Sequence, residues 1–351
     1  MLKPEAVEKI PEETVRIAKA AFPKGSVIMK LRDEFGSLYK DEDFAELFSN
    51  TGQPALAAWR LALVTVFQYL ENLTDRQAAD AVRGRLDWKY ALGLELADAG
   101  FDFSVLSEFR HRLVEGKREQ LLLDAMLGHF TAKGLVKMGG KGRTDSSHVL
   151  AKVRILNRLE LIGETLRATL NDLATVLPSW LQSIAEPEWY ERYGTRVSDY
   201  RLPKSEEKRK AYALQVGADG YKLLDALAEL PADIADRSAV QVLKAVWQQN
   251  FERQDEKLRW LRELQAAAPK GQRSPIASPY DPEAKRSVKR STHWVGYKVH
   301  LSESCDDDMP HVITNVHLSA ATEQDVSTTP QVHAQLKQKN LLPDTHLVDA
   351  G

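Results

Sequence analysis

Cysteine is almost absent from this chain of 351 residues, and its single residue, Cys305, excludes both a disulfide framework and a zinc site built from cysteines. Such usage is typical of compartments where thiols stay reduced, so we expect the cytoplasm. Long apolar runs are missing too. The most apolar stretch, Ala55–Leu70, contains Arg60 and Gln68 and is shorter than the roughly 20 residues of a membrane span. The N-terminal residues mix acids and bases, so we expect neither a signal peptide nor a membrane partner.

An excess of either charge is also missing, since the net charge is −2. Its distribution is more informative. Seven lysines and arginines lie between Lys133 and Arg158 against one acid, Asp145, whereas the residues from Leu301 onward contain eight acids and two lysines. Basic surface beside an acidic site suits an enzyme that processes DNA, because cations bind phosphates and carboxylates bind metal ions. An ordinary charged surface that happens to segregate is the alternative.

Residues 1–45 are predicted to form an N-terminal adaptor, and residues 46–135 a domain of short helices. Pro54 opens a run that is apolar on most faces and therefore belongs in a core. Thr74 and Gln77 have the spacing of a capping box and predict the start of a helix, and Ser104 is expected to cap another. Short helices joined by tight turns are typical of small domains that bind DNA through a helix-turn-helix.

The pattern changes after residue 135. Gly139–Leu150 predicts a strand, whereas residues 151–274 have mostly helical periodicity, interrupted by prolines, and end in a turn-rich linker. Two alternating strands, a helix and a short apolar strand follow. We therefore predict an α+β protein. Residues 136–150 and 275–351 would form part of a ribonuclease-H-like α/β domain, and residues 151–274 a large helical insertion after its first strand.

In such a sheet the fourth strand pairs parallel to the first through a helical crossover. A carboxylate on the first strand and one at the end of the fourth then lie side by side. Asp145 and Asp349 occupy these two places. Their joint placement, rather than either residue alone, predicts a shared metal site.

Several stretches together resemble bacterial insertion-sequence transposases of the DDE class with a helical N-terminal domain. The N-terminal part of the resemblance covers Leu47 to Leu113 and includes LTDRQAADAVRGRLDWKYALGL and FDFSVLSEFRHRL. TDSSHV, from Thr144, resembles the motif around the first catalytic aspartate of these enzymes, and LVDAG, from Leu347, resembles the start of the motif at the second. YDPEAKRSVKRSTHWVGYKVHLSES resembles the segment that leads into their sheet, whereas residues 151–270 carry little of the resemblance.

The resemblance implies a DNA transposase that cleaves phosphodiester bonds and transfers strands at the ends of an insertion sequence. Asp145 and Asp349 would be catalytic, metal-binding carboxylates, with Mg²⁺ or Mn²⁺ as the cofactor. The family's third metal ligand, a glutamate, matches no residue here, so we expect that this chain alone does not complete transposition. The expected partners are double-stranded DNA at terminal inverted repeats and further copies of the chain, in a homo-oligomer on the DNA.

Basic and aromatic residues beside these motifs are predicted to contact DNA: Arg143, Lys285, Arg286, Lys289, Arg290 and His293. A solvated basic loop is the alternative for the group that begins at Lys285. Ser146, Ser147 and His148 could support the metal site, although His148 is expected to alternate to the opposite face of its strand and pack there.

Two other functions stay open. The chain could be a non-catalytic DNA-binding protein or repressor derived from a transposase. It could instead be a metal-dependent hydrolase that uses the histidines on its predicted strands, namely His293, His300, His311 and His317. Their mixed register favours ordinary strand histidines over a metal site.

Overall fold

The computed structural model describes residues 1–4, 9–152, 154, 156–254, 257–261, 275–289 and 292–349. The fold is mixed α+β, which confirms the predicted class. Within these residues the chain divides into two compact units. The first unit comprises Met1–Gly140, Ser304–Val312 and Lys339–Leu341. The second comprises Lys141–Glu303, Ile313–Gln338 and Leu342–Gly351.

The first unit is helical and has its own apolar core, which includes Trp59, Trp88 and Phe109. The rings of Trp88 and Tyr90 are both buried within this unit. The elements are α1 (Glu12–Ala21), α2 (Val27–Phe35), η1 (Asp41–Leu47), α3 (Ala58–Leu70), α4 (Asp75–Gly84), α5 (Leu86–Leu92), α6 (Ser104–Glu115) and α7 (Leu121–Ala132).

The first backbone N–H groups of the helices in this unit are capped by nearby residues at α4 and α6 and by a residue distant in sequence at α3. The predicted capping box is confirmed, because Thr74 and Gln77 bond reciprocally at the start of α4. The prediction for Ser104 is wrong. Ser104 is already inside α6, and its N–H donates to the Asp102 carboxylate at 2.9 Å. At α3 the buried Asp41 accepts the Trp59 N–H at 3.0 Å from a distant part of the sequence.

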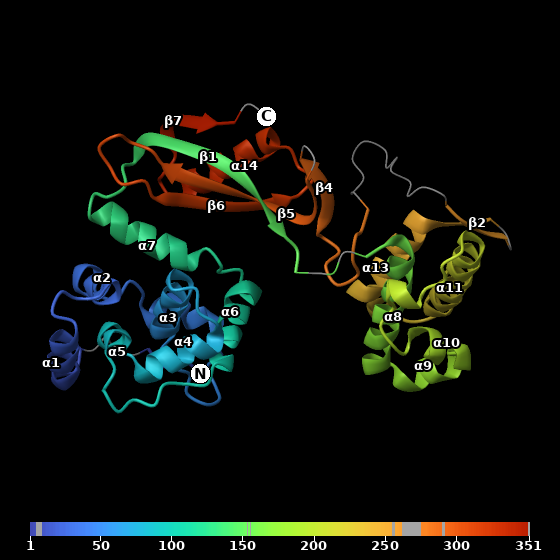
Figure 1. Ribbon diagram of the computed structural model, residues 1–351, viewed down its shortest axis with the longest axis horizontal. Coiled ribbons are helices and arrows are strands. Elements are labelled where there is room, and N and C mark those ends of the chain that lie inside the picture. Colours follow the sequence, from blue (N-terminus) through green and yellow to red (C-terminus); the bar gives the residue numbers. More distant parts are fainter. Residues whose placement is uncertain are drawn as a thin grey trace. The chain divides into compact units, whose positions relative to one another are not determined.

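The second unit contains a mixed sheet with the strand order β4-β5-β1-β7 and with β6 also paired to β5. Its members are β1 (Gly139–Leu150), β4 (Lys285–Lys289), β5 (Thr292–Ser304), β6 (Ile313–Ala320) and β7 (Pro343–Val348). β5 is antiparallel to β4 and to β6. Gly142 lies against Pro343, and Thr144 lies against His346, so β1 and β7 advance in the same direction (Figure 1).

Helix α14 (Asp325–Gln338) connects β6 to β7 and packs against β6. Val332 and Leu336 supply its buried apolar contacts. Around them lie buried polar side chains from the strands and the helix, namely His300, Ser302, Asn315, Ser319 and Thr328. Because buried polar groups require partners, this interface depends on specific hydrogen bonds as well as on apolar area.

The chain between β1 and β4 is mainly helical and has a separate core around Ile162, Leu223 and Trp247. Pro178 and Pro187 each begin a new helix, as their fixed φ allows. The residues beyond Asn250 differ from the expected helix, because they form a two-stranded sheet apart from the central one. The elements are α8 (Arg158–Val176), α9 (Pro178–Ile184), α10 (Pro187–Tyr193), η2 (Asp199–Arg201), α11 (Glu206–Leu227), α12 (Ala232–Ala235), α13 (Ser238–Asn250), β2 (Phe251–Gln254) and β3 (Lys257–Trp260).

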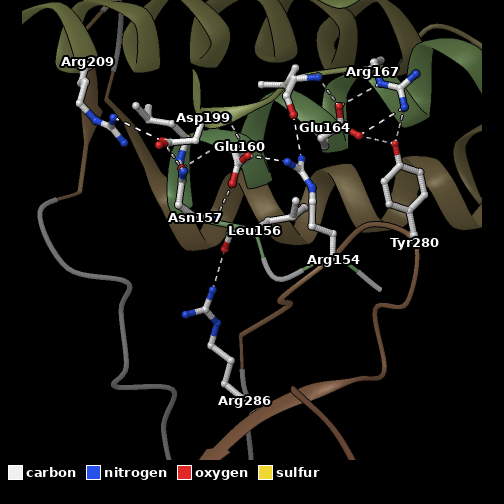
Figure 2. A network of polar contacts seen from close by, with 12 residues as sticks. Arg154, Leu156, Asn157, Glu160, Glu164, Arg167, Asp199, Arg209, Tyr280 and Arg286 are labelled. Carbon is white, nitrogen blue, oxygen red and sulfur yellow. Dashed lines mark hydrogen bonds and ion pairs between the residues drawn. The ribbon is translucent and has the colours of Figure 1, made fainter. Parts of the chain in front are cut away.

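A polar network surrounds the start of α8, close to the strand by which the chain re-enters the sheet (Figure 2). Glu164 accepts hydrogen bonds from Arg167, the Tyr280 hydroxyl and the Val197 N–H. Glu160 accepts from Arg154 and from backbone N–H groups, including that of Asp199. These bonds join α8 to the segments that flank it in space, including the returning residues around Tyr280.

Candidate active site

Asp145 lies in the middle of β1, and its side chain is exposed. Its Oδ1 accepts a hydrogen bond of 2.7 Å from the N–H of the next residue, Ser146. This contact orients the carboxylate without burying it. The other acceptor positions of the group therefore face solvent, which is what a ligand for a hydrated cation needs.

Asp349 follows directly after β7, the strand beside β1. Asp145 and Asp349 line the same small pocket, whose volume is about 20 Å³. They also line one wider groove on the sheet, together with Arg143 and Glu303. The two carboxylates thus line the same cavities in the second unit.

Gly142 permits the close approach of the two strands that carry these carboxylates. A Cβ at this position would lie 2.9 Å from Cγ of Pro343, at the start of β7. Any larger residue would have to displace that proline ring. The absence of a side chain at Gly142 therefore helps to hold Asp349 next to Asp145.

A second set of polar groups lies between Asp145 and the start of α14. Ser146 Oγ donates to Oδ2 of Asp325 at 2.7 Å, and Lys298 Nζ donates to Oδ1 of the same carboxylate at 2.9 Å. Burial alone raises the pKa of Asp325, but the hydrogen bonds from Lys298 and Ser146 outweigh this effect and lower the pKa below its ordinary value. Asp325 is thus ionised at neutral pH, and it lines the same pocket as Asp145.

Two histidines connect α14 to the strands at the other side of the pocket. His346 Nδ1 is hydrogen-bonded to His333 Nε2 at 2.7 Å, and its Nε2 is hydrogen-bonded to Thr144 Oγ1 at 2.8 Å. Thr144 Oγ1 also pairs with Ser302 Oγ at 2.7 Å. Burial lowers the pKa of His346, and the neighbouring His333 lowers it further. This network links β7, β1 and β5 at the residue that precedes Asp145.

The donor set in the pocket suits Mg²⁺ or Mn²⁺. Asp145 and Asp349 offer carboxylate oxygens, the ligands that these hard cations prefer, and both side chains are exposed enough for the ion to keep several waters. Among the residues that the structure describes, no three histidine, cysteine or acidic side chains are grouped so that they could hold a metal ion.

The candidate DNA-contacting residues divide into two groups. Arg143 lies two residues before Asp145 and donates to Glu303 Oε1 at 2.8 Å. Lys285, Arg286 and Lys289 lie on β4 rather than on a solvated loop, and His293 is exposed on β5 opposite Val288.

Two of the β4 residues already have partners within the chain. Lys285 Nζ donates to the Pro282 carbonyl at 2.7 Å. Arg286 Nη2 donates to the Leu156 carbonyl, also at 2.7 Å (Figure 2). Arg290 lies outside the described residues, as does the side chain of Lys289. Of the side chains described in this group, those of Lys285, Arg286 and His293 line neither of the two cavities that contain Asp145 and Asp349.

The strand histidines have structural contacts. His300 is buried, and its ring nitrogens pair with Ser319 Oγ at 2.9 Å and, more weakly, with Thr328 Oγ1 at 3.4 Å. His317 pairs with Gln335, while His311 lies in the loop between β5 and β6. His148 packs its ring against Trp294, with 5.0 Å between the ring centroids. These contacts agree with ordinary strand histidines.

Sequence reasoning missed Asp325, Lys298 and His346. Nothing in the local pattern distinguishes Asp325 from any acid in the first turn of a helix. Lys298 lies inside a strand, where lysine usually points to solvent. Their partners are distant, as Ser146 and Asp325 are 179 residues apart in sequence. Only the folded sheet brings these groups to the pocket.

Residues 17–112 match a family model described as a transposase domain, DUF772. The match supports a transposase-family function, and it overlaps the stretch whose sequence resembles the N-terminal domain of such enzymes. No curated protein and no solved structure matches the chain. In the part of the chain that the structure describes, no helix has the length and apolarity to cross a bilayer.

Proposed function

We propose that this protein is a metal-dependent DNA transposase of the DDE class, which cleaves phosphodiester bonds and transfers strands at the ends of an insertion sequence. The observation that carries the proposal is the shared pocket of Asp145, on β1, and Asp349, directly after the neighbouring β7. The match of residues 17–112 to a transposase domain supports it. The strand order β6-β5-β1-β7, with α14 as the crossover before β7, supports a ribonuclease-H-like sheet.

Asp145 and Asp349 would hold Mg²⁺ or Mn²⁺ through their carboxylate oxygens. The ion supplies Lewis-acid stabilisation of the charge that develops on the oxygens around phosphorus. The protein's own contribution is to hold the two carboxylates together. Ser146 N–H orients Asp145, and the hydrogen bonds from His346 to Thr144 and His333 tie the end of β7 to β1 and to α14.

Double-stranded DNA is the proposed substrate, and the element's terminal inverted repeats the proposed binding sites. Arg143 lies in the groove beside Asp145, where its guanidinium can neutralise a phosphate next to the reacting one. We also propose that Lys285 and Arg286 on β4 and the exposed His293 on β5 contact the DNA backbone. We further propose that copies of the chain assemble on the DNA, one at each element end.

Metal binding by the full chain tests this function directly. We expect the chain to bind Mn²⁺, measured as loss of the free-ion signal in electron paramagnetic resonance, and we expect Asp145→Asn and Asp349→Asn each to remove that binding. Asp344→Asn is the matched control. Asp344 is exposed on β7, the strand that precedes Asp349, but it lines neither cavity.

A DNA assay with the same variants separates the two main functions. With DNA from the regions that flank the gene, Mn²⁺-dependent strand cleavage that is lost in Asp145→Asn would support the catalytic site. It would also contradict the expectation that this chain alone does not complete transposition. Salt-sensitive DNA binding without an Asp145-dependent metal site would instead identify a non-catalytic DNA-binding protein and refute the proposal.

A further inference from the structure

We infer that Asp325 is a positioning residue for this site: with Lys298 it fixes the Ser146 hydroxyl and, through the Ser146 backbone, the carboxylate of Asp145. The inference rests on the proposed metal site at Asp145 and Asp349. It assigns to Asp325 a role different from that of a third metal ligand.

The contacts form a continuous path from β5 to the reactive carboxylate. Lys298 Nζ donates to Asp325 Oδ1 at 2.9 Å, Ser146 Oγ donates to Asp325 Oδ2 at 2.7 Å, and Ser146 N–H donates to Asp145 Oδ1 at 2.7 Å. Alternation along β1 explains the arrangement, since Thr144 and Ser146 share one face of the strand. Both of these hydroxyls face partners on the side of α14.

Lys298 holds Asp325 in a defined orientation. Its ammonium donates a second hydrogen bond to the Glu323 carbonyl at 2.7 Å, and its side chain is only 17% exposed. An ammonium held by two acceptors in a partly buried place cannot easily move away. Asp325, which is 27% exposed, therefore has one oxygen committed to Lys298 and the other to Ser146.

The hydrogen bond to Asp325 determines where the Ser146 hydroxyl hydrogen points. An ionised carboxylate can only accept, so Ser146 must point its proton at Asp325. Direct metal binding by Asp325 is disfavoured, because the cation would lie beside the Lys298 ammonium.

Mn²⁺ affinity of the full-length chain tests the inference without any activity assay. Loss of a side chain that orients a metal ligand commonly weakens binding by about tenfold or more. We expect Asp325→Asn and Ser146→Ala each to weaken Mn²⁺ binding by about tenfold. The double variant should bind no more weakly than the weaker single variant, because both changes break the same path. Ser146→Thr keeps the hydroxyl and should restore the affinity.

Ser327→Ala and Asp344→Asn serve as matched controls, since both residues are exposed and neither lines the pocket. Thermal melting without metal identifies any variant that does not fold. If Asp325→Asn is one of these, Ser146→Ala and Ser146→Thr still decide the question.

Three results would overturn the inference while leaving the proposed function intact. These are additive effects of the two substitutions, loss of binding in Asp325→Asn as complete as in Asp145→Asn, and wild-type affinity in both single variants. Absence of Asp145-dependent Mn²⁺ binding in the wild type would instead refute the proposed function, and the inference with it.

Discussion

Two groups of carboxylates in the second unit have opposite surroundings. Glu164 at the start of α8 is 1% exposed and accepts from Arg167, Tyr280 and a backbone N–H (Figure 2). Asp145 on β1 is exposed and accepts from the N–H of its own neighbour. Both are acids at the edge of a polar network, so residue type alone does not distinguish them.

The difference lies in how much acceptor capacity each carboxylate has left. Glu164 has its lone pairs used inside the protein and has no room for a ligand, so its function is to join α8 to the 195–199 segment and to Tyr280. Asp145 keeps acceptor positions directed to solvent beside Asp349. Buried and saturated carboxylates stabilise, whereas exposed and oriented ones can bind a cation.

The largest effect is expected from Glu164→Gln. Removing one charge from a buried, hydrogen-bonded ion pair leaves Arg167 uncompensated and typically costs about 3 kcal/mol. Chemical denaturation followed by tryptophan fluorescence would measure the loss of unfolding free energy. Asp145→Asn is the comparison and should change stability by less than about 0.5 kcal/mol. Equal losses in the two variants would contradict the distinction between saturated and open carboxylates.

Sequence reasoning could recover features with a local cause. The capping box at Thr74, the alternating strand around Lys298 and the final strand before Asp349 follow from patterns within a few residues. The pairing of Asp145 with Asp349 followed from strand order. β4 was not predicted because its residues are mostly charged, and its strand conformation depends on pairing with β5. The roles of Glu164 and Asp325 depend on partners brought together only by folding.

Gly142→Ala tests whether the open site depends on strand alignment rather than on side-chain partners. The new methyl group would overlap the Pro343 ring, and such overpacking costs about 1–3 kcal/mol. Mn²⁺ binding should weaken as well, because β7 carries Asp349 away from β1. In the control, Gly128→Ala, the methyl group meets nothing within 4 Å on α7, so the higher helix propensity of alanine should leave the protein equally or more stable. Unchanged Mn²⁺ affinity in Gly142→Ala would show that metal binding does not depend on the alignment of β1 and β7.

Acidification should reveal the buried imidazole beside the pocket. Burial lowers the pKa of His300, an effect that the charge of Asp325 opposes and that His317 and Lys298 reinforce. The unfolded chain then binds a proton more readily than the folded one. Stability is therefore complete above the ordinary value of 6.5 and falls as the pH decreases toward the folded pKa.

Protonation of His300 changes the free energy of unfolding by at most about 1.4 kcal/mol per pH unit. His300→Gln should have a shallower loss of stability between pH 6.5 and 5 than the wild type. Denaturation curves at several pH values in this interval would give the free energy of unfolding of each protein. An equal pH dependence in the wild type and His300→Gln would contradict the lowered pKa of His300.

The smallest effects are expected at the arginines proposed to contact DNA, and they extend the same comparison to cations. Arg286 already donates to the Leu156 carbonyl, whereas Arg143 is 52% exposed and pairs with Glu303 on the surface. A surface ion pair contributes little stability, so Arg143 can exchange Glu303 for a phosphate at low cost.

Arg143→Ala should therefore reduce DNA affinity in the full chain and lower the slope of log affinity against log salt by about one. Arg286→Ala should change that slope less and should instead reduce stability, because the Leu156 carbonyl loses its charged donor. Titrations of labelled DNA at several salt concentrations would measure both slopes. A larger slope change in Arg286→Ala than in Arg143→Ala would mean that the bond to Leu156 is given up when DNA binds.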